Sequence, residues 1–500
     1  MNLLQAMIRR HLGTGAATLL LGIGLAMSAS PAAADTKLPD TAAGHLAGDL
    51  VQGINAGSTA RIEQWTGKVL STAMPQEDRK AFIDALSASI RDSGGVDIVD
   101  VQASPKQPDM LQLVVKARRN GHMGLFTLAT DPKQSGLLAQ ALVMPMEDPA
   151  LYAGWRGQAT TPASMGNLIH ATLDKLAKSS DFSGCVTVAD GDTTMFQECR
   201  GLADRTFGVP VDAQTKFHIG SIGKMFTAVA IAQLVEDGKL SWNDTLASRV
   251  PEYPDHDAAS KITVWQLLHH TAGLGDFMVP EYFAHRESFI DPADYLQLIA
   301  RQPRPGEPGK QWIYSNAGYV LLGRIIENVS HERYVDYIRQ HIFTRAGMTA
   351  SGFDRLDDVT PHLATGYYRP GIFSSTWKAD WVVLGIQGGP AGGGYSNNTD
   401  LLRFAAALRG GKLVKSKTLN RMFEDQTPAG PGGYAAGFGD RLSQGKHIRG
   451  HAGGIEGTDA NLQMIWGTGY AVALTSNQGP GEKWMLAEHI ADLLAGRASP

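Results

Sequence analysis

Ser221 and Lys224 lie three positions apart at the start of a stretch whose apolar residues recur at helical spacing as far as Val235. Residues three apart on a helix share one face, with Cβ atoms about 5–6 Å apart. The beginning of a helix also carries unpaired backbone N–H groups and a dipole that favour negative charge. A hydroxyl beside an amine at such a place is a candidate nucleophile and base for acyl transfer.

The same spacing allows a second interpretation, in which Ser221 only caps the helix and Lys224 faces solvent. The pattern Ser-x-x-Lys also occurs from Ser375 to Lys378, where no helical apolar pattern follows. After Ser221, by contrast, we expect an amphipathic helix that ends near Gly238. The context therefore singles out the first pair.

Tyr314-Ser315-Asn316 is a second candidate set, directly before another helical apolar pattern. A phenol held beside cations loses its proton more easily and can act as a base, and a nearby amide can orient a substrate. A similar triplet, Tyr395-Ser396-Asn397, follows a run of glycines. For either tyrosine, ordinary packing in the core is the alternative.

His451-Ala452-Gly453-Gly454 is the third candidate set, just before a predicted C-terminal hairpin. Small residues let a substrate lie along an exposed strand whose backbone N–H groups point at it. A comparable triplet, His122-Met123-Gly124, lies in the N-terminal part of the chain. Each triplet thus occurs elsewhere in the chain, and only order and context distinguish the copies.

The elements around these sets predict one α+β domain over residues 166–500. A helix near 165–178 leads into a hairpin, a helix-rich middle runs to about 410, and strands return at 462–466 and 470–476 before a last helix. Strands from both ends can join one antiparallel sheet flanked by helices, with the middle as an inserted helical subdomain. We expect the ligand site in a cleft between the two.

Three other segments precede this domain. Residues 1–34 have the pattern of a signal peptide, with Arg9 and Arg10, an apolar stretch too short to span a bilayer, and small residues before a mature start near Asp35. Residues 35–150 read as helices followed by four strands, a small α+β domain, and 151–165 as a linker. The sequence therefore predicts a periplasmic or secreted protein without a membrane anchor after cleavage; an uncleaved anchor is the alternative.

Cys185 and Cys199 are the only cysteines, and they flank a turn signal at Asp190-Gly191-Asp192. Pairing Asp190 with Thr194 puts the two cysteines opposite each other, with Cα atoms about 4.5–5.5 Å apart. A cross-strand disulfide fits an oxidising compartment, and a pair of buried thiols is the alternative.

The composition limits the classes of molecule that the protein is expected to bind. The chain has 500 residues, of which 43% are hydrophobic and 19% charged, so it can bury a large core. The net charge of −4 and the absence of a basic run in the mature region argue against nucleic acid. The sequence contains neither a metal-binding motif nor a phosphate loop, and we expect no cofactor. The expected partner is a small molecule; the oligomeric state stays open.

The ordered set Ser221/Lys224, Tyr314/Asn316 and His451/Gly453 resembles the serine β-lactamase and penicillin-recognising hydrolase superfamily. The most similar branch comprises class C β-lactamases, D-alanyl-D-alanine carboxypeptidases and family VIII esterases. The N-terminal unit is similar to nuclear-transport-factor-2-like domains.

This resemblance implies roles for the candidate residues. Ser221 would form an acyl-enzyme, with Lys224 and Tyr314 as acid and base. Asn316 would hold the substrate amide or the lysine, and His451 would contact the acid or leaving group of the substrate. The N–H groups of Ser221 and Gly454 would form an oxyanion hole.

One departure affects the expected substrate. Many β-lactamases carry Lys-Thr-Gly at the third motif, whereas this chain has His451, which is a weaker partner for a carboxylate at neutral pH. We therefore expect an exported serine hydrolase that cleaves an ester or amide. The alternatives are a D-Ala-D-Ala carboxypeptidase or weak β-lactamase acting on cell-wall-type substrates, and a non-catalytic ligand-binding protein of the same fold.

Neighbouring residues carry less information. His269 and His270 follow two leucines, and we expect both to stabilise the fold rather than to catalyse. Asp276 and Glu281 border the expected cleft without an assigned partner.

The disulfide gives the first prediction. Because export favours oxidation, the non-reduced protein should resist thiol alkylation at Cys185 and Cys199, and mass spectrometry of the exported form checks this. Two alkylated thiols would contradict the pairing.

Overall fold

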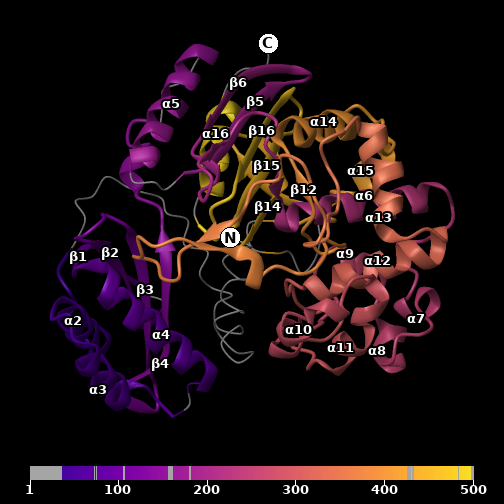
Figure 1. The fold of residues 1–500 in the computed structure, drawn as a ribbon. Helices are drawn as coiled ribbons and strands as arrows, with labels where there is room; N and C mark the ends of the chain where they lie inside the picture. The colour runs from indigo at the N-terminus through magenta and orange to yellow at the C-terminus, as the bar shows by residue number, and fades with distance from the viewer. Residues whose placement is uncertain are drawn as a thin grey trace. The chain divides into compact units, whose positions relative to one another are not determined.

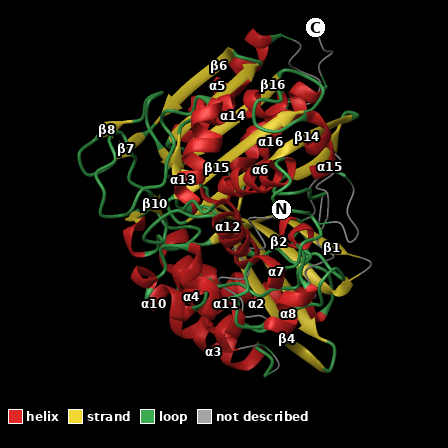
Figure 2. Ribbon diagram, turned by 90° about the vertical axis from the view of Figure 1, so that its right-hand side faces the viewer, coloured by secondary structure: helices red, strands yellow, loops and turns green. Residues whose placement is uncertain are grey.

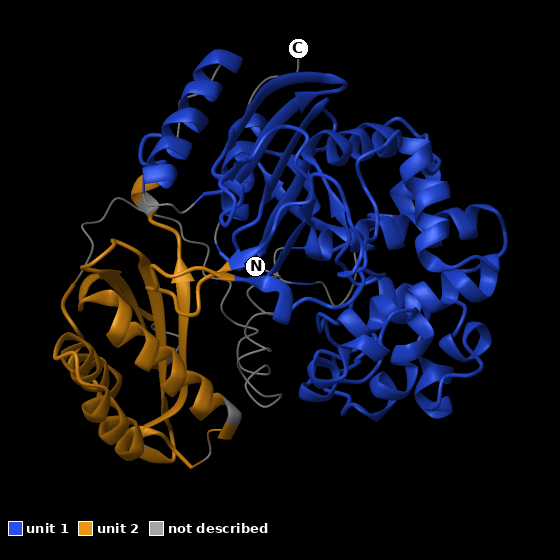
Figure 3. Cartoon of the chain, viewed as in Figure 1, with its two compact units in different colours: residues 1–3, 152–367, 379–500 blue, residues 4–151, 368–378 orange. Residues whose placement is uncertain are grey.

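The structure is a computed structural model that describes residues 36–496 except 73, 75, 105–106, 156–160, 179–181, 425–429, 431–432 and 482. The predicted signal peptide and the expected mature start at Asp35 lie outside the described residues. Within them, the chain forms two compact units (Figure 3). One comprises residues up to 151 together with 368–378, and the other comprises 152–367 and the residues from 379 onward.

The N-terminal unit packs three helices against a four-stranded antiparallel sheet of order β1-β2-β3-β4 (Figure 1). Its elements are α2 (Ala42–Asn55), α3 (Thr59–Val69), α4 (Gln76–Ser93), β1 (Val96–Ser104), β2 (Gln107–Ala117), β3 (Met123–Asp131) and β4 (Gln134–Met146). The Thr41 and Ser58 side chains accept from backbone N–H groups at the starts of α2 and α3. Leu50, Leu113 and Phe126 are fully buried between helices and sheet.

A late segment of the chain, residues 368–378, belongs to this N-terminal unit. It is bounded by the short strands β10 (Tyr367–Tyr368) and β11 (Lys378–Ala379). Phe373 is fully buried in the core, with its ring centroid 6.3 Å from that of Phe126. Asn120 Nδ2 donates to the Phe373 carbonyl over 2.7 Å. No pattern in the sequence indicates that this segment packs into the N-terminal unit. Phe373 is 253 positions after Asn120, the residue of that unit to which it hydrogen-bonds.

The second unit contains the expected single antiparallel sheet, built from both ends of the domain. Its six strands lie in the order β13-β14-β15-β16-β5-β6 (Figure 2). The strands are β5 (Gly184–Asp190), β6 (Thr193–Arg200), β13 (Gly439–Ser443), β14 (Lys446–Ile455), β15 (Thr458–Ile465) and β16 (Tyr470–Ser476). The α+β class and this architecture confirm the expected fold.

Helices cover both faces of this sheet. On one face, Val472 and Leu474 pack with α5 (Pro162–Lys178) and α16 (Trp484–Ala495). On the other face, Ala471 and Ala473 belong to the larger core that includes α6 (Gly223–Glu236). Because alternate residues of a strand face opposite sides, β16 is apolar on both.

The β5–β6 hairpin differs from the predicted one at its turn. Asp190 pairs with Thr193 rather than with Thr194, so the turn holds only Gly191 and Asp192. Gly191 has a φ of +59°, which suits such a two-residue turn. A bulge next to Val188 then restores the register, and Cys185 lies opposite Cys199 with Sγ atoms 2.04 Å apart.

The middle of the unit is helical. Its helices are α6, α7 (Leu246–Arg249), α8 (His256–Lys261), α9 (Val264–Leu268), α10 (Pro280–Ala284), α11 (Leu296–Arg301), α12 (Asn316–Ser330), α13 (Tyr334–Ile338), α14 (Asn398–Arg409) and α15 (Ser416–Met422). Short strands are β7 (Leu202–Asp204), β8 (Val209–Pro210), β9 (Phe217–His218) and β12 (Tyr395–Ser396). None of the described helices has both the length and the apolar character needed to cross a bilayer.

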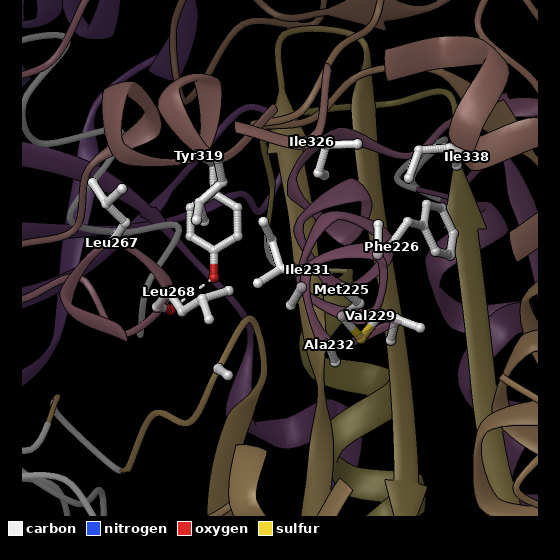
Figure 4. Packing of buried hydrophobic residues seen from close by; sticks show 14 of the residues in the cluster. Met225, Phe226, Val229, Ile231, Ala232, Leu267, Leu268, Tyr319, Ile326 and Ile338 are labelled. Atoms are coloured by element: carbon white, nitrogen blue, oxygen red, sulfur yellow. Dashed lines mark hydrogen bonds between the residues drawn. The ribbon is translucent and has the colours of Figure 1, made fainter. Parts of the chain in front are cut away.

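Helix α6 lies at the centre of the core (Figure 4). Every residue from Gly223 to Leu234 is buried, so the expectation of an amphipathic helix with a solvent face is wrong. The reason is that α6 contacts α12 and α13 as well as β14, which leaves no side open to water. Lys224, near the first turn of this helix, is therefore buried too.

The segment 368–378 yields a stability prediction. Phe373→Ala should destabilise the N-terminal unit by about 3–5 kcal/mol, because it removes a buried ring and leaves a cavity. Urea unfolding monitored by hydrogen exchange of β3 amides measures the change. Phe207→Ala is the matched control, since that ring is 84% exposed. Equal unfolding of the two variants would refute a structural role for Phe373.

Candidate active site

Ser221 lies in a single 3-10 turn, η4 (Gly220–Ile222), that leads directly into α6. Gly220 has a φ of +50°, and a Cβ there would lie 2.9 Å from the backbone N of Gly454. A side chain at residue 220 would thus push η4 away from β14. The glycine keeps the candidate nucleophile close to the backbone of that strand.

Lys224 is fully buried, and its Nζ lies 3.0 Å from Ser221 Oγ. The amine also donates to Asn316 Oδ1 over 2.8 Å and to the carbonyl oxygen of Ala391. Burial lowers the pKa of Lys224 to about 7, while the nearby Asp276 carboxylate opposes this shift. A large neutral fraction of the amine is therefore present at neutral pH.

The neighbours of Lys224 suit the neutral amine, which has two hydrogens and one lone pair. Asn316 Oδ1 and the Ala391 carbonyl can only accept, so they take the two hydrogens. The amine donates to Ser221 Oγ in the structure, and in its neutral form the lone pair can instead accept the hydroxyl hydrogen of Ser221. This arrangement is that of a general base next to a nucleophile.

Asp276 fixes which end of the Asn316 amide faces the lysine. Asn316 Nδ2 donates to Asp276 Oδ2 over 2.9 Å, so Oδ1 points to Lys224. The Met278 N–H donates to the other carboxylate oxygen of Asp276 over 3.2 Å. The sequence alone assigns Asp276 no partner, because nothing in the local pattern connects it with Asn316, 40 positions away.

Tyr314 is the third group at the nucleophile. Its Oη donates to Ser221 Oγ over 3.0 Å, and the Lys224 Nζ lies 4.9 Å from its ring centroid. Burial raises the pKa of Tyr314 well above its usual value, and the hydrogen bond with Ser221 only partly opposes this. The expectation that the phenol loses its proton more easily here is therefore wrong. Tyr314 is a neutral donor in the resting site, and Lys224 is the available base.

The third set lies on β14, beside η4. A Cβ on Gly453 would lie 1.9 Å from the Ile219 carbonyl oxygen and 3.0 Å from the Ser221 N, so only glycine allows this contact. His451 is buried, and burial lowers its pKa to about 3, with the charge of Lys224 acting in the same direction. His451 is accordingly neutral near pH 7.

The two histidines of the Leu-Leu-His-His stretch differ. His269 Nδ1 lies 2.7 Å from the Trp265 carbonyl oxygen, a contact within the end of α9 that stabilises the fold. His270 instead hydrogen-bonds Tyr434 and Ser315, and its φ of +57° is rare for a residue with a side chain. Tyr434 lies in a glycine-rich stretch and was not singled out from the sequence.

The structure thus brings four of the predicted site residues into direct contact and places the others on one neighbouring strand. Ser221, Lys224, Tyr314 and Asn316 form one hydrogen-bonded group, and the residues of the third set line the adjacent strand. Glu281 pairs with Arg301 and does not contact this group. Asp276 and the Ala391 carbonyl also hydrogen-bond to this group, although neither belongs to the three sequence motifs.

A separate cluster could in geometry bind a cation. Ligand atoms of His170, Asp174 and Glu198 lie within 4.8 Å of one another. Arg200 Nη2, however, lies 3.0 Å from Asp174 and 2.7 Å from Glu198, so a guanidinium already neutralises both carboxylates.

Several known proteins are similar to this chain in sequence. A family model described as Beta-lactamase matches residues 169–497. Bacillus subtilis PbpX is 33% identical over 266 residues (53% of this chain, 64% of that protein), and penicillin-binding protein 4* of the same organism is 32% identical over 260 residues (48% and 55%). The chain thus spans less than two thirds of the length of these curated relatives.

Solved structures show the same similarity. A penicillin-binding protein from Bacillus halodurans is 27% identical with a TM-score of 0.56, covering 63% of this chain and 97% of that one. A D-stereospecific amidohydrolase from Streptomyces sp. is 26% identical with a TM-score of 0.53, covering 61% of this chain and 94% of that one.

The lowered pKa of Lys224 predicts how the labelling of Ser221 depends on pH. Because Lys224 acts as a base only when neutral, the rate at which a fluorophosphonate labels Ser221 should rise with pH, with a midpoint near 7. Asp276→Asn keeps an acceptor for Asn316 but removes the anion that raises the pKa of Lys224, so the midpoint should move to lower pH.

Labelling rates measured from about pH 5 to 9 read this midpoint directly. Asp336→Asn is the control, since Asp336 lies on α13 and is paired with Arg339, just after the end of that helix. An unchanged or higher midpoint in Asp276→Asn would rule out the electrostatic role of this carboxylate.

Proposed function

The chain belongs to the beta-lactamase family, whose fold is that of serine hydrolases, and on this premise we propose that it cleaves esters or amides through an acyl-enzyme on Ser221. The observation that carries the proposal is the pair of contacts at one oxygen. Ser221 Oγ lies 3.0 Å from a buried amine whose pKa is about 7 and 3.0 Å from a neutral phenol. A base and an acid thus meet at one nucleophile.

Acylation follows from these contacts. Neutral Lys224 takes the hydroxyl proton while Ser221 Oγ attacks the carbonyl carbon of the substrate. The N–H groups of Ser221 and Gly454 are the proposed donors to the resulting oxyanion; loss of one such donor costs about 10²–10³ in turnover. Tyr314 then gives its proton to the leaving group as the bond between carbonyl carbon and leaving group breaks.

Deacylation returns both protons. The Tyr314 phenolate takes a proton from the attacking water, and the Lys224 ammonium returns its proton to Ser221 Oγ as the acyl group leaves. Asn316 keeps the lysine in place through both steps. At the end of the cycle every group has its starting proton.

A small ester or amide is the favoured substrate class. The similarity to a D-stereospecific amidohydrolase supports an amide, and the similarity to penicillin-binding proteins supports cell-wall-type peptides or weak β-lactam hydrolysis as the alternative. The neutral His451 favours the first class, because it supplies no cation for a carboxylate.

Export is part of the same proposal. The signal-peptide pattern of residues 1–34 supports a periplasmic or secreted protein. The adjacent sulfur atoms of Cys185 and Cys199 fit such a compartment, where a disulfide persists.

A non-catalytic ligand-binding protein of the same fold is the rival function. It predicts binding without turnover, and it gives no reason for a buried lysine with a lowered pKa beside the serine. The choice between the two functions therefore depends on covalent chemistry at Ser221.

Substitution of Ser221 distinguishes a hydrolase from a non-catalytic binding protein. Ser221→Ala should abolish labelling by fluorophosphonate or penicillin and lower the hydrolysis of p-nitrophenyl esters by about 10³-fold or more. Ser375→Ala is the matched control, because Ser375 begins the other Ser-x-x-Lys and is exposed in the N-terminal unit. Hydrolysis that survives Ser221→Ala unchanged would reject the acyl-enzyme.

A further inference from the structure

The strand that leads into the candidate nucleophile is paired with a strand that leads out of a glycine-rich segment. Strand β9 ends three residues before Ser221 and pairs antiparallel with β12. The pairing extends beyond both strands, because the Ile219 N–H donates to the Gly394 carbonyl over 3.1 Å. A further backbone hydrogen bond of 3.1 Å lies one residue nearer the active site. These paired segments, 217–220 and 393–396, form a short ribbon.

The turn before β12 supplies acceptors to two side chains of α6. Two backbone hydrogen bonds, of 2.8 and 3.1 Å, join Gly389 to Gly392 and close this turn. At its tip, the Ala391 carbonyl accepts from Lys224 Nζ, and the preceding carbonyl accepts from Thr227 Oγ1 over 2.8 Å. The same amine lies 3.0 Å from the oxygen of the candidate nucleophile. The register of the ribbon therefore sets where the nucleophile lies relative to the acceptor of its base.

A buried histidine and carboxylate join the two segments that flank β12. Tyr395 of β12 has His218 as its partner on one edge and Gly352 on the other, with two backbone hydrogen bonds of 2.9 and 3.0 Å to the latter. His218 Nε2 lies 3.1 Å from Asp354 Oδ2, two residues beyond Gly352. The two side chains are 14% and 5% exposed. Their bond thus ties both neighbours of β12 together.

The surroundings of His218 favour its charged form. Burial lowers the pKa of His218, but the hydrogen bond with Asp354 and the charge of that carboxylate outweigh burial, and the charge of Asp380 adds to them. The pKa of His218 is therefore raised above its ordinary value. A hydrogen bond between two charged groups is shorter and stronger than a neutral one, so this bond resists movement of the segments that it joins.

We propose that His218 is a positioning residue whose bond with Asp354 holds the ribbon in the register that keeps the acceptor of Lys224 in place. Within the part of the chain that the structure describes, neither partner of this bond hydrogen-bonds the amine or the nucleophile. Loss of the bond would let β12 shift against β9, and the amine would lose its orientation toward the hydroxyl. The kinetic consequence rests on the proposed hydrolase function, whereas the contact between the amine and the turn does not.

Labelling of Ser221 by a fluorophosphonate tests this role. His218→Leu removes the donor to Asp354 and should lower the limiting labelling rate about tenfold or more, while the half-saturating concentration stays within about twofold. His218→Gln keeps a neutral donor and should retain most of the wild-type rate. His341→Leu is the control, because it removes a histidine 3.0 Å from Glu332 Oε1 beyond the end of α13, and it should label like the wild type.

A double variant separates positioning from stability. His218→Leu alone leaves the Asp354 carboxylate buried without its partner, which lowers folding stability. His218→Leu combined with Asp354→Leu removes that charge, so it should regain thermal stability relative to the single variant and yet label slowly. A double variant that recovers both stability and the wild-type rate overturns the proposal. So does a His218→Leu variant that labels as fast as the control.

Nitrogen NMR of labelled lysine tests the contact without any chemistry at Ser221. The Nζ resonance of Lys224, assigned with Lys224→Met, should shift in the double variant and coincide with the wild type in His218→Gln and His341→Leu. An unshifted resonance in the double variant overturns the proposal. If the wild-type protein is not labelled at Ser221, the acyl-enzyme proposal fails and this resonance alone decides the positioning role.

Discussion

The burial of the Lys224 amine is the constraint on which the rest of the site depends. A charged ammonium inside a core is costly unless it is paired, so the amine there either gains acceptors or loses its proton. The fold does both, because Asn316 and the Ala391 carbonyl take its hydrogens while burial lowers its pKa. This requires the start of α12 and the glycine-rich segment near residue 391 to meet at α6. The contacts of Lys224 with Ser221 and Asn316 are thus a consequence of core packing.

Much of the site could be predicted because its side chains lie in short motifs at the starts of helices and within a strand. Ser221 with Lys224, Tyr314 with Asn316, and His451 with Gly453 each have a recognisable order and context. Asp276, Tyr434 and the Ala391 carbonyl could not be found this way. A carbonyl oxygen has no residue identity, and the other two join the site only through contacts between distant segments. The sequence predicts a lowered pKa for Tyr314 wrongly, because burial, which a sequence does not reveal, raises that pKa more than the hydrogen bond with Ser221 lowers it.

For the fold, too, features set by the local sequence could be predicted, whereas features set by contacts between distant segments could not. Alternating apolar residues located the four strands of the first unit and β5, β6, β15 and β16 of the second, and both ends of the second unit entered one sheet as expected. Strands β13 and β14 were not predicted, and the His451 set lies within β14 rather than before the hairpin. The turn after Asp190 was misplaced by one residue, because a bulge can absorb the difference without changing the pairing of the cysteines. The apolar repeat of α6 predicted a helix but not its burial on all sides, which depends on what packs around it.

Because Phe373 lies in the core of the N-terminal unit, that unit is incomplete when its own strands leave the ribosome. Asn120 and its acceptor at Phe373 are 253 positions apart, which corresponds to tens of seconds of synthesis at about 5–20 residues per second. Until then the nascent strands carry an unfilled apolar gap, and the unit cannot reach its final packing. The first domain should therefore lose stability when it is produced without residues 368–378, because the place of the Phe373 ring in its core is then empty.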